Sequence, residues 1–248
     1  MSIFNSRGVI IKCRDINDND KILWIFTEKF GKITVIAKGA KKSKSKFMPI
    51  SLIFCFGNYT LFKGKSMFNV NEGEIIDSFQ QFLSDLDTLT YASYLCELID
   101  LSMVEGESNR TLFREFVTAF YLIKNKVGDI ETLTRAFEIK LLALTGYTLN
   151  LDYCVKCRKK IDTSNYFSYQ YYGGICNQCD KSNGKTISFA AFKTLSYLSK
   201  LSLDKVYRVN LDSKIKDEVY NILSDLILQS YGKKPKSLEI LDSLKRSD

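Results

Sequence analysis

Four cysteines in two closely spaced pairs constrain this chain more than any other feature of its sequence. The first pair is Cys154-x-x-Cys157, and after a further eighteen residues comes the second, Cys176-x-x-Cys179. A C-x-x-C turn brings two thiolates to one side of a tight loop. Two such loops supply four sulfur ligands in a tetrahedron, the geometry that zinc prefers in structural sites. The spacing therefore predicts one structural zinc ion held by all four cysteines.

Other arrangements of these cysteines stay open at this point: disulfides, a redox-active dithiol pair, or four unconnected thiols. If all four bind zinc, no coordination position is left for a catalytic water, so we expect the ion to hold structure and not to perform chemistry. The remaining cysteines, Cys13, Cys55 and Cys96, stand among apolar residues and are expected to be buried. An odd number of cysteines with a zinc-type pattern favours a reducing, cytoplasmic location over a disulfide framework.

Composition places the chain among ordinary globular proteins. Its 248 residues are 45% hydrophobic and 26% charged, and no apolar run approaches the ~18 residues of a membrane span. The first seven residues do not resemble a signal peptide. The chain has no histidine, and it therefore lacks the commonest general base and catalytic metal ligand. We expect a cytoplasmic protein that is not an enzyme, has no small-molecule substrate and does not bind a membrane.

The net charge of +8 is unevenly distributed along the chain. Residues 1–78 carry 13 basic and 7 acidic side chains, which gives +6. Residues 79–150 carry 6 and 10, which gives −4, and residues 151–248 carry 17 and 11, which again gives +6. This layout indicates contact with a polyanion at both ends of the chain and an acidic middle.

Five short segments rich in β-branched and aromatic residues occupy the first 78 residues, separated by turn signals such as Asn17-Asp-Asn-Asp20. They are Val9–Cys13, Lys21–Phe26, Lys32–Ala37, Leu52–Phe62 and Met67–Ile76. Five strands with no helical pattern among them predict a small antiparallel barrel. The five-stranded OB-fold has this count and commonly binds single strands. The pattern alone does not distinguish it from an SH3-like barrel.

The loop between the third and fourth of these strands is strongly basic. It contains five lysines, Lys38, Lys41, Lys42, Lys44 and Lys46, together with two serines and one glycine. Such a flexible cationic arm is typical of a site that binds phosphate backbones through charge. A solvated surface loop is the alternative. We expect four more basic residues to extend the nucleic-acid-binding surface across the barrel: Arg7, Lys12, Lys63 and Lys65.

From about Phe79 the apolar period becomes helical. Three amphipathic helices are predicted between residues 79 and 146, with caps at Asn109 and Asp129. Two more follow Thr186, the second beginning at Asp212. The sequence thus predicts an α+β protein, with the cysteine segment inserted into an all-α domain. The expected parts are the barrel (1–78), the helical domain (79–150), a zinc-finger insertion (151–186) and the rest of the helical domain (187–248).

Several of these features together resemble the bacterial RecO family of recombination mediators, over essentially the whole chain. The resemblance is carried by Arg7-Gly-Val-Ile10, by Lys38-Gly-Ala40, and most sharply by Phe137-Glu-Ile-Lys-Leu-Leu-Ala-Leu-Thr-Gly-Tyr147 leading to the first cysteine pair. Phe167-Ser168, Gly173-Gly174 and the second cysteine pair continue it. The resemblance implies an N-terminal OB-fold, a helical domain and a bound zinc ion.

The resemblance also implies a function in DNA repair and several partners. It implies binding to single- and double-stranded DNA, annealing of complementary strands, and cooperation with RecR in loading RecA onto strands coated by single-stranded DNA-binding protein. It implies contact with the acidic, phenylalanine-ended tail of that coat protein, which needs an apolar pocket rimmed by basic residues. The candidates are Arg110, Arg114, Arg135 and Lys140, although each could be a solvated helix charge.

Two other functions compete with this interpretation. The first is a zinc-ribbon scaffold or transcription-type factor that binds proteins and does not anneal DNA. The second is a zinc-dependent enzyme acting on nucleic acid, against which the missing histidines and the saturated ligand set both argue. A bacterial, nucleoid-associated location is implied only by the resemblance to the RecO family.

Overall fold

The computed structural model describes residues 3–64, 67–182 and 184–245. Its contacts divide the chain into two compact units, which we describe separately. The first unit comprises residues 1–124 and 235–248, and the second comprises residues 125–234. These units follow packing, whereas the predicted boundaries after residues 78, 150 and 186 follow changes of sequence pattern. The predicted boundaries therefore stay predictions.

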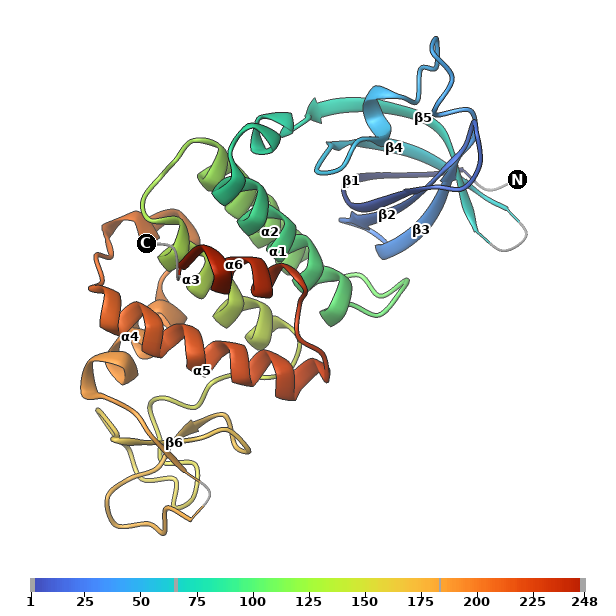
Figure 1. The fold of residues 1–248 in the computed structure, drawn as a ribbon. Coiled ribbons are helices and arrows are strands. Elements are labelled where there is room, and N and C mark those ends of the chain that lie inside the picture. Colours follow the sequence, from blue (N-terminus) through green and yellow to red (C-terminus); the bar gives the residue numbers. More distant parts are fainter. Residues whose placement is uncertain (1–2, 65–66, 183, 246–248) are drawn as a thin grey trace. The chain divides into compact units, whose positions relative to one another are not determined.

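The first unit contains a closed barrel with the strand order β1-β2-β3-β5-β4 (Figure 1). Its strands are β1 (Ile3–Asp15), β2 (Lys21–Thr27), β3 (Gly31–Ala37), β4 (Phe56–Lys63) and β5 (Phe68–Asp77). β1 closes the barrel by pairing antiparallel with β4, and β3 meets β5 in a short parallel register. The predicted α+β class with an N-terminal five-stranded barrel is confirmed.

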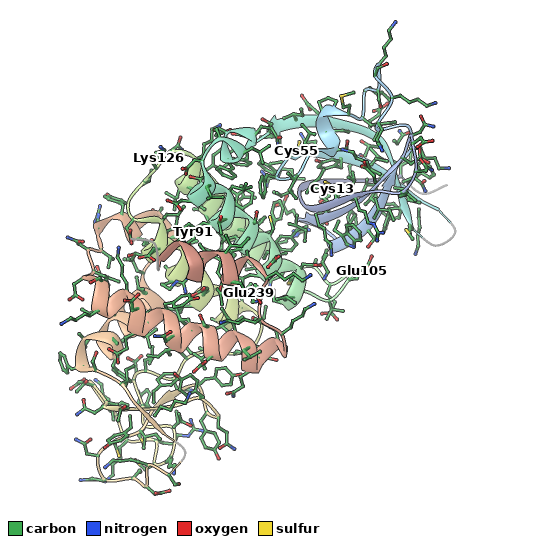
Figure 2. The ribbon with its side chains drawn as sticks, viewed as in Figure 1. Cys13, Cys55, Tyr91, Glu105, Lys126 and Glu239 are labelled. Atoms are coloured by element: carbon green, nitrogen blue, oxygen red, sulfur yellow. The ribbon has the colours of Figure 1, made fainter. Side chains whose placement is uncertain are left out.

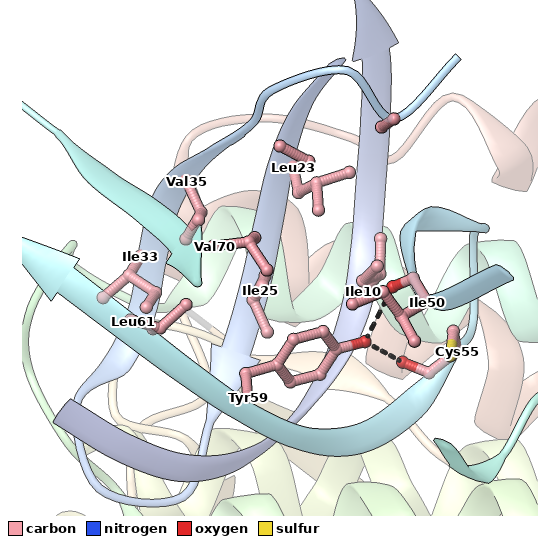
Figure 3. Packing of buried hydrophobic residues seen from close by; sticks show 12 residues of the cluster. Ile10, Leu23, Ile25, Ile33, Val35, Ile50, Cys55, Tyr59, Leu61 and Val70 are labelled. Atoms are coloured by element: carbon pink, nitrogen blue, oxygen red, sulfur yellow. Dashed lines mark hydrogen bonds between the residues drawn. The ribbon is translucent and has the colours of Figure 1, made fainter. Parts of the chain in front are cut away.

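Alternation of side chains along each strand fills the barrel interior. In β3, Ile33, Val35 and Ala37 are buried while the residues between them are half-buried, the period of two that one inward face requires. The interior also holds a tyrosine, whose polar end needs a partner. Tyr59 donates a hydrogen bond to the carbonyl of Ile50 at 3.1 Å (Figure 3). A buried hydroxyl is thus satisfied at one end of the core.

The fourth predicted strand begins later than its apolar sequence suggested. β4 starts at Phe56, and the preceding residues form a 3-10 helix (Pro49–Ser51) and a turn with Phe54 at φ 68°. The ring of Phe54 packs edge-on against Phe82 and Phe120, with ring centroids 5.7 and 5.9 Å away. Phe54 is thus buried against helical residues of the first unit, and its left-handed backbone conformation interrupts the extended chain before Phe56, which explains the difference.

Three helices and a 3-10 turn complete the described part of the first unit. They are η2 (Gln80–Ser84), α1 (Leu86–Ser102), α2 (Arg110–Lys124) and α6 (Ser237–Lys245). The predicted cap at Asn109 is present, since its side chain accepts the N–H of Leu112 at 2.9 Å. Glu97 of α1 accepts the backbone N–H of Ser237 at 3.0 Å and thereby caps α6, which packs against α1. The end of the chain is therefore part of the first unit.

The second unit is helical with an irregular cysteine-bearing segment. Its elements are α3 (Ile130–Leu144), β6 (Tyr166–Ser168), β7 (Gly173–Gly174), β8 (Lys185–Thr186), α4 (Phe189–Lys200), η3 (Leu203–Arg208) and α5 (Ser213–Tyr231). α3 packs against α4, η3 and α5. The predicted caps are confirmed: Asp129 accepts the N–H of Thr132, and Asp212 that of Ile215, each at 2.9 Å. Within the described ranges, no helix combines the length and hydropathy needed to cross a membrane.

Candidate metal centre and nucleic-acid interface

The four predicted cysteine ligands come together in the second unit. All four sulfur atoms lie within 4.8 Å of one another. Cys154 Sγ is 3.9 Å from Cys179 Sγ, and Cys157 Sγ is 3.7 Å from Cys176 Sγ. A tetrahedral ion about 2.3 Å from each sulfur would hold the sulfurs about 3.8 Å apart. These distances therefore match a metal site, and they exceed the about 2.05 Å of a disulfide bond.

Backbone hydrogen bonds shape the first cysteine pair into a tight loop. The N–H of Cys154 donates to the carbonyl of Lys159 at 2.8 Å, and the N–H of Arg158 donates to the carbonyl of Cys154 at 2.9 Å. The N–H of Val155 donates to the carbonyl of Gly174 in β7 at 3.0 Å. The hairpin formed by β6 and β7 thus lies directly against the first pair and leads into the second.

Hydrogen bonds within the cluster shift the pKa values of three of its thiols. Burial alone would raise the pKa of Cys154, but N–H groups of Cys157 and Cys176 outweigh it and lower this pKa to about 6. A backbone N–H likewise lowers the pKa of Cys176. Hydrogen bonds with the thiols of Cys157 and Cys176 raise the pKa of Cys179 to about 12. Four crowded sulfurs cannot all ionise unless a positive charge lies among them, so the donor set fits one metal ion.

The lysine loop, residues 38–46, is held to the barrel by hydrogen bonds. Gly39 donates its N–H to the carboxylate of Asp20 at 2.7 Å, and Lys41 donates its N–H to the carbonyl of Asn19 at 2.9 Å. The side chain of Ala40 is fully buried in the barrel core. Where the sequence suggested a flexible arm, the structure has a run of turns anchored on the β1–β2 loop. The lysines are thus presented from a fixed base.

All five lysines of this loop are exposed, but one has an acidic partner. The Nζ of Lys41 lies 2.9 Å from the carboxylate of Asp15. Lys46 Nζ lies 5.2 Å from the ring centre of Phe47. For Lys38, Lys42 and Lys44 the described part of the chain offers no carboxylate within 4.0 Å. Most of the loop's charge is therefore available to a polyanion.

The other predicted barrel cations differ in their surroundings. Arg7 forms a two-pronged ion pair with Glu28, with both N···O distances 3.0 Å. Lys12 Nζ lies 4.9 Å above the ring of Trp24 and 3.6 Å from a carboxylate oxygen of α1. Lys63 is exposed at the end of β4, and Lys65 lies outside the described residues. The structure therefore does not join all four to the lysine loop as one patch.

The four basic residues suggested for a partner tail fall in different units. Arg110 and Arg114 are exposed one turn apart on α2, in the first unit. Arg135 and Lys140 belong to α3, in the second unit. The expectation that Arg135 lies on a polar face is wrong, because only 3% of this residue is exposed. It pairs with the buried Glu138 at 3.2 Å, so its charge is used inside the unit.

Sequence reasoning did not select two features of the barrel surface. Trp24, the only tryptophan, is half-buried on the outer face of β2 directly opposite Lys12. Lys29 lines a shallow pocket of about 330 Å³ together with Arg7 and Asn58. Strand alternation could have placed Trp24 outside, since Leu23 beside it points inward. Figure 2 also places the labelled Cys13 and Cys55 in the barrel, where Cys55 is buried as expected and Cys13 is only half-buried.

Comparison with known proteins covers the whole chain. Residues 1–79 match the family model described as the N terminal of recombination protein O, and residues 83–239 match the model of its C terminal. A DNA repair protein RecO of Clostridium acetobutylicum is 66% identical over 245 residues, which cover 99% of each chain.

More distant relatives carry the same name. That of Clostridium novyi is 51% identical over 248 residues, covering 100% of this chain and 97% of the relative. That of Symbiobacterium thermophilum is 31% identical over 250 residues, covering 99% of each. Both family models and relatives at high identity thus agree along the full length. The chain belongs to the RecO family of DNA repair and recombination proteins.

Proposed function

We propose that this protein is a non-enzymatic recombination mediator, which binds single- and double-stranded DNA and anneals complementary strands. The observation that carries the proposal is the lysine loop, whose exposed cations stand on a closed barrel and have few acidic partners. Such charge binds phosphate backbones without regard to sequence and leaves the bases free to pair. Annealing follows from neutralising two strands and raising their local concentration.

In this proposal the barrel is an OB-fold. The strand order β1-β2-β3-β5-β4, with a closing pair between β1 and β4, supports that assignment. OB-folds bind single strands through a cationic groove and aromatic side chains on which bases stack. The half-buried ring of Trp24 with Lys12 above it is a suitable stacking position on the outer face. The phosphate contacts would come from Lys38, Lys42, Lys44 and Lys46.

The metal ion in this proposal is zinc, one per chain, bound by Cys154, Cys157, Cys176 and Cys179. Four thiolates are a soft ligand set, and the sulfur separations of 3.7 and 3.9 Å suit tetrahedral zinc. When bound, the ion supplies a fixed cross-link between the two cysteine pairs. Backbone N–H groups of the chain hold the sulfurs in place, as the N–H of Cys176 does for the sulfur of Cys154.

The same proposal assigns three protein partners: RecR, RecA as the recombinase that is loaded, and the tail of single-stranded DNA-binding protein. For the tail, Arg110 and Arg114 support the first unit as the docking side because both are exposed on one face of α2. Lys140 is half-buried in the second unit. The expected location is the cytoplasm, in association with the nucleoid. A protein-binding scaffold without annealing activity is the competing function.

The test replaces Lys41, Lys42, Lys44 and Lys46 by alanine together. If these side chains contact phosphates, the affinity for all sequences falls alike, and the slope of log affinity against log salt becomes shallower by up to about 3 for single strands. Lys41 contributes less than the others because Asp15 already pairs with it. Unchanged affinity with an unchanged slope refutes the role of the loop. Strand cleavage by the wild-type protein in the presence of a divalent metal refutes the non-enzymatic proposal.

A further inference from the structure

Arg158, which directly follows the first cysteine pair, has a backbone conformation that disfavours its own side chain. Its φ is 62°, in the left-handed region that glycine adopts at little cost. The hydrogen bond from the Cys154 N–H to the Lys159 carbonyl, 2.8 Å long, requires the chain to turn back at this point. The geometry of the loop therefore favours glycine or asparagine, and an arginine here calls for another explanation.

The residues after Arg158 are tied back to the chain before the first cysteine pair. Lys160 pairs antiparallel with Tyr153, and the N–H of Ile161 donates to the carbonyl of Asp152 at 3.0 Å. Arg158, Lys159 and Lys160 are all exposed. Three consecutive cations are thus fixed at the rim of the metal centre by the same hydrogen bonds that position Cys154.

Of the six basic residues in the four-cysteine segment (residues 151–186), these three are the ones for which the described ranges offer neither an acidic partner nor an aromatic ring. Lys156 pairs with Asp180 at 3.0 Å, and Lys185 pairs with Asp225 at 3.1 Å. Lys181 Nζ lies 4.9 Å from the ring centre of Tyr166 and donates to a backbone carbonyl at 3.1 Å. Lys159 reaches only a neutral amide, Gln178, at 3.4 Å. The cluster of three is therefore free to contact an anion.

We propose that Arg158, Lys159 and Lys160 form a second contact for the phosphate backbone of nucleic acid, in addition to the lysine loop. This inference rests on the proposed function, because it concerns the same ligand. The lysine loop belongs to the first unit and this cluster to the second. One chain then has two cationic contacts, and each contact can hold one of the two strands that are to be annealed.

A different role for the same charges is compensation of the metal centre. Four thiolates around a divalent ion carry a net charge of about −2, which nearby cations would stabilise. Backbone N–H groups already serve this purpose, as with the Cys176 N–H that donates to the Cys154 sulfur at 3.3 Å. Lys156 also supplies a positive charge from within the cysteine loop, with its side chain 24% exposed. The two roles predict different behaviour when the three cations are removed.

The test uses a triple variant that also relieves the backbone conformation: Arg158→Gly, Lys159→Ala and Lys160→Ala. Its control removes three exposed lysines elsewhere in the second unit: Lys205→Ala, Lys214→Ala and Lys233→Ala. Metal content, thermal midpoint and single-strand affinity at several salt concentrations are measured for both variants and for the wild-type chain. Loss of three phosphate contacts should make the slope of log affinity against log salt concentration shallower by about 2. When salt rises from about 50 to about 200 mM, the affinity of the wild-type chain should therefore fall by about 20-fold more than that of the triple variant.

We expect the triple variant to keep one metal ion per chain and to show this reduced slope, while the control keeps the wild-type slope. The single variant Arg158→Gly should melt at the same or a higher temperature and still bind DNA more weakly. Wild-type affinity and slope in the triple variant overturn the inference and leave the proposed function standing. Loss of the metal in the triple variant also overturns it, because the cations then serve the ion. Absence of DNA binding by the wild-type chain refutes both proposals.

Discussion

Replacing Cys154 by serine should remove the metal ion and unfold the four-cysteine segment while the rest of the chain stays folded. Cys154 is fully buried, and its sulfur lies 3.9 Å from that of Cys179. A serine hydroxyl is a poor ligand beside three thiolates, so the site loses its fourth donor. We expect the metal content to fall from one ion per chain to well below one.

The magnitude follows from how little else holds this segment together. Its hydrophobic core contains Val155 and Ile175, with Ile161 and Tyr166 only partly buried against them. Burial of two aliphatic side chains contributes about 3–6 kcal/mol. Binding of a structural zinc ion contributes about 10–16 kcal/mol. Metal binding therefore stabilises the segment more than its hydrophobic packing does, and the segment should not stay folded without the ion.

Metal analysis and amide hydrogen exchange test this directly. In the Cys154→Ser variant, protection should disappear in residues 152–180 and persist in the strands of the barrel, which belongs to the other unit. Cys13→Ser is the matched control, since that half-buried cysteine lies in β1. A Cys154→Ser chain that retains a full equivalent of metal and unchanged protection would refute the structural role of the site.

Three further predictions concern stability. Arg135→Leu leaves Glu138 buried without its cation and should lower the free energy of unfolding of the second unit in urea by about 3–5 kcal/mol. The double variant Arg135→Leu, Glu138→Leu should recover most of this loss. Equal losses in the single and double variants would contradict the prediction. Burial would raise the pKa of Asp129, but hydrogen bonds from Thr132 and Lys216 outweigh it and lower this pKa. The ionised carboxylate therefore stabilises the folded chain above about pH 4, and this stabilisation is lost as the pH falls below that value. Asp129→Asn should therefore cost about 1 kcal/mol at neutral pH and less at pH ~3, and a larger cost in acid would disprove the assignment. Gly31 has φ 64°, and a Cβ there would lie 1.8 Å from a carbonyl oxygen of the α1–α2 loop, so Gly31→Ala should lower the thermal midpoint of the first unit by more than any exposed alanine substitution.

Local signals in the sequence predicted much of this fold. Asn109, Asp129 and Asp212 each cap a helix because the oxygen of a short side chain reaches the N–H three residues later. Gly232 ends α5 in a left-handed conformation, φ 69°, for an equally local reason. The cysteine cluster was predictable since each C-x-x-C turn sets the distance between its own two sulfurs.

Features that depend on distant residues were not predictable. The charge of Arg135 is buried because Glu138 and the ring of Tyr220, 85 residues further along the chain, surround it, with the ring centre 4.8 Å from the guanidinium carbon. A helical pattern shows only that the position is polar. The anchoring of the lysine loop likewise depends on a hydrogen bond from Gly39 to Asp20, in a separate loop. Such pairings arise from tertiary structure, and no spacing along the chain encodes them.

Strand annealing tests the central claim most directly. The rate at which complementary single strands pair is measured with the wild-type chain and with the Lys41, Lys42, Lys44 and Lys46 alanine variant, at low and at high salt, on bare strands and on strands coated by single-stranded DNA-binding protein. We predict acceleration by the wild-type chain on both substrates at low salt, a marked loss at high salt, and little acceleration by the variant. Failure of the wild-type chain to accelerate pairing, or equal acceleration by the variant, would contradict the account.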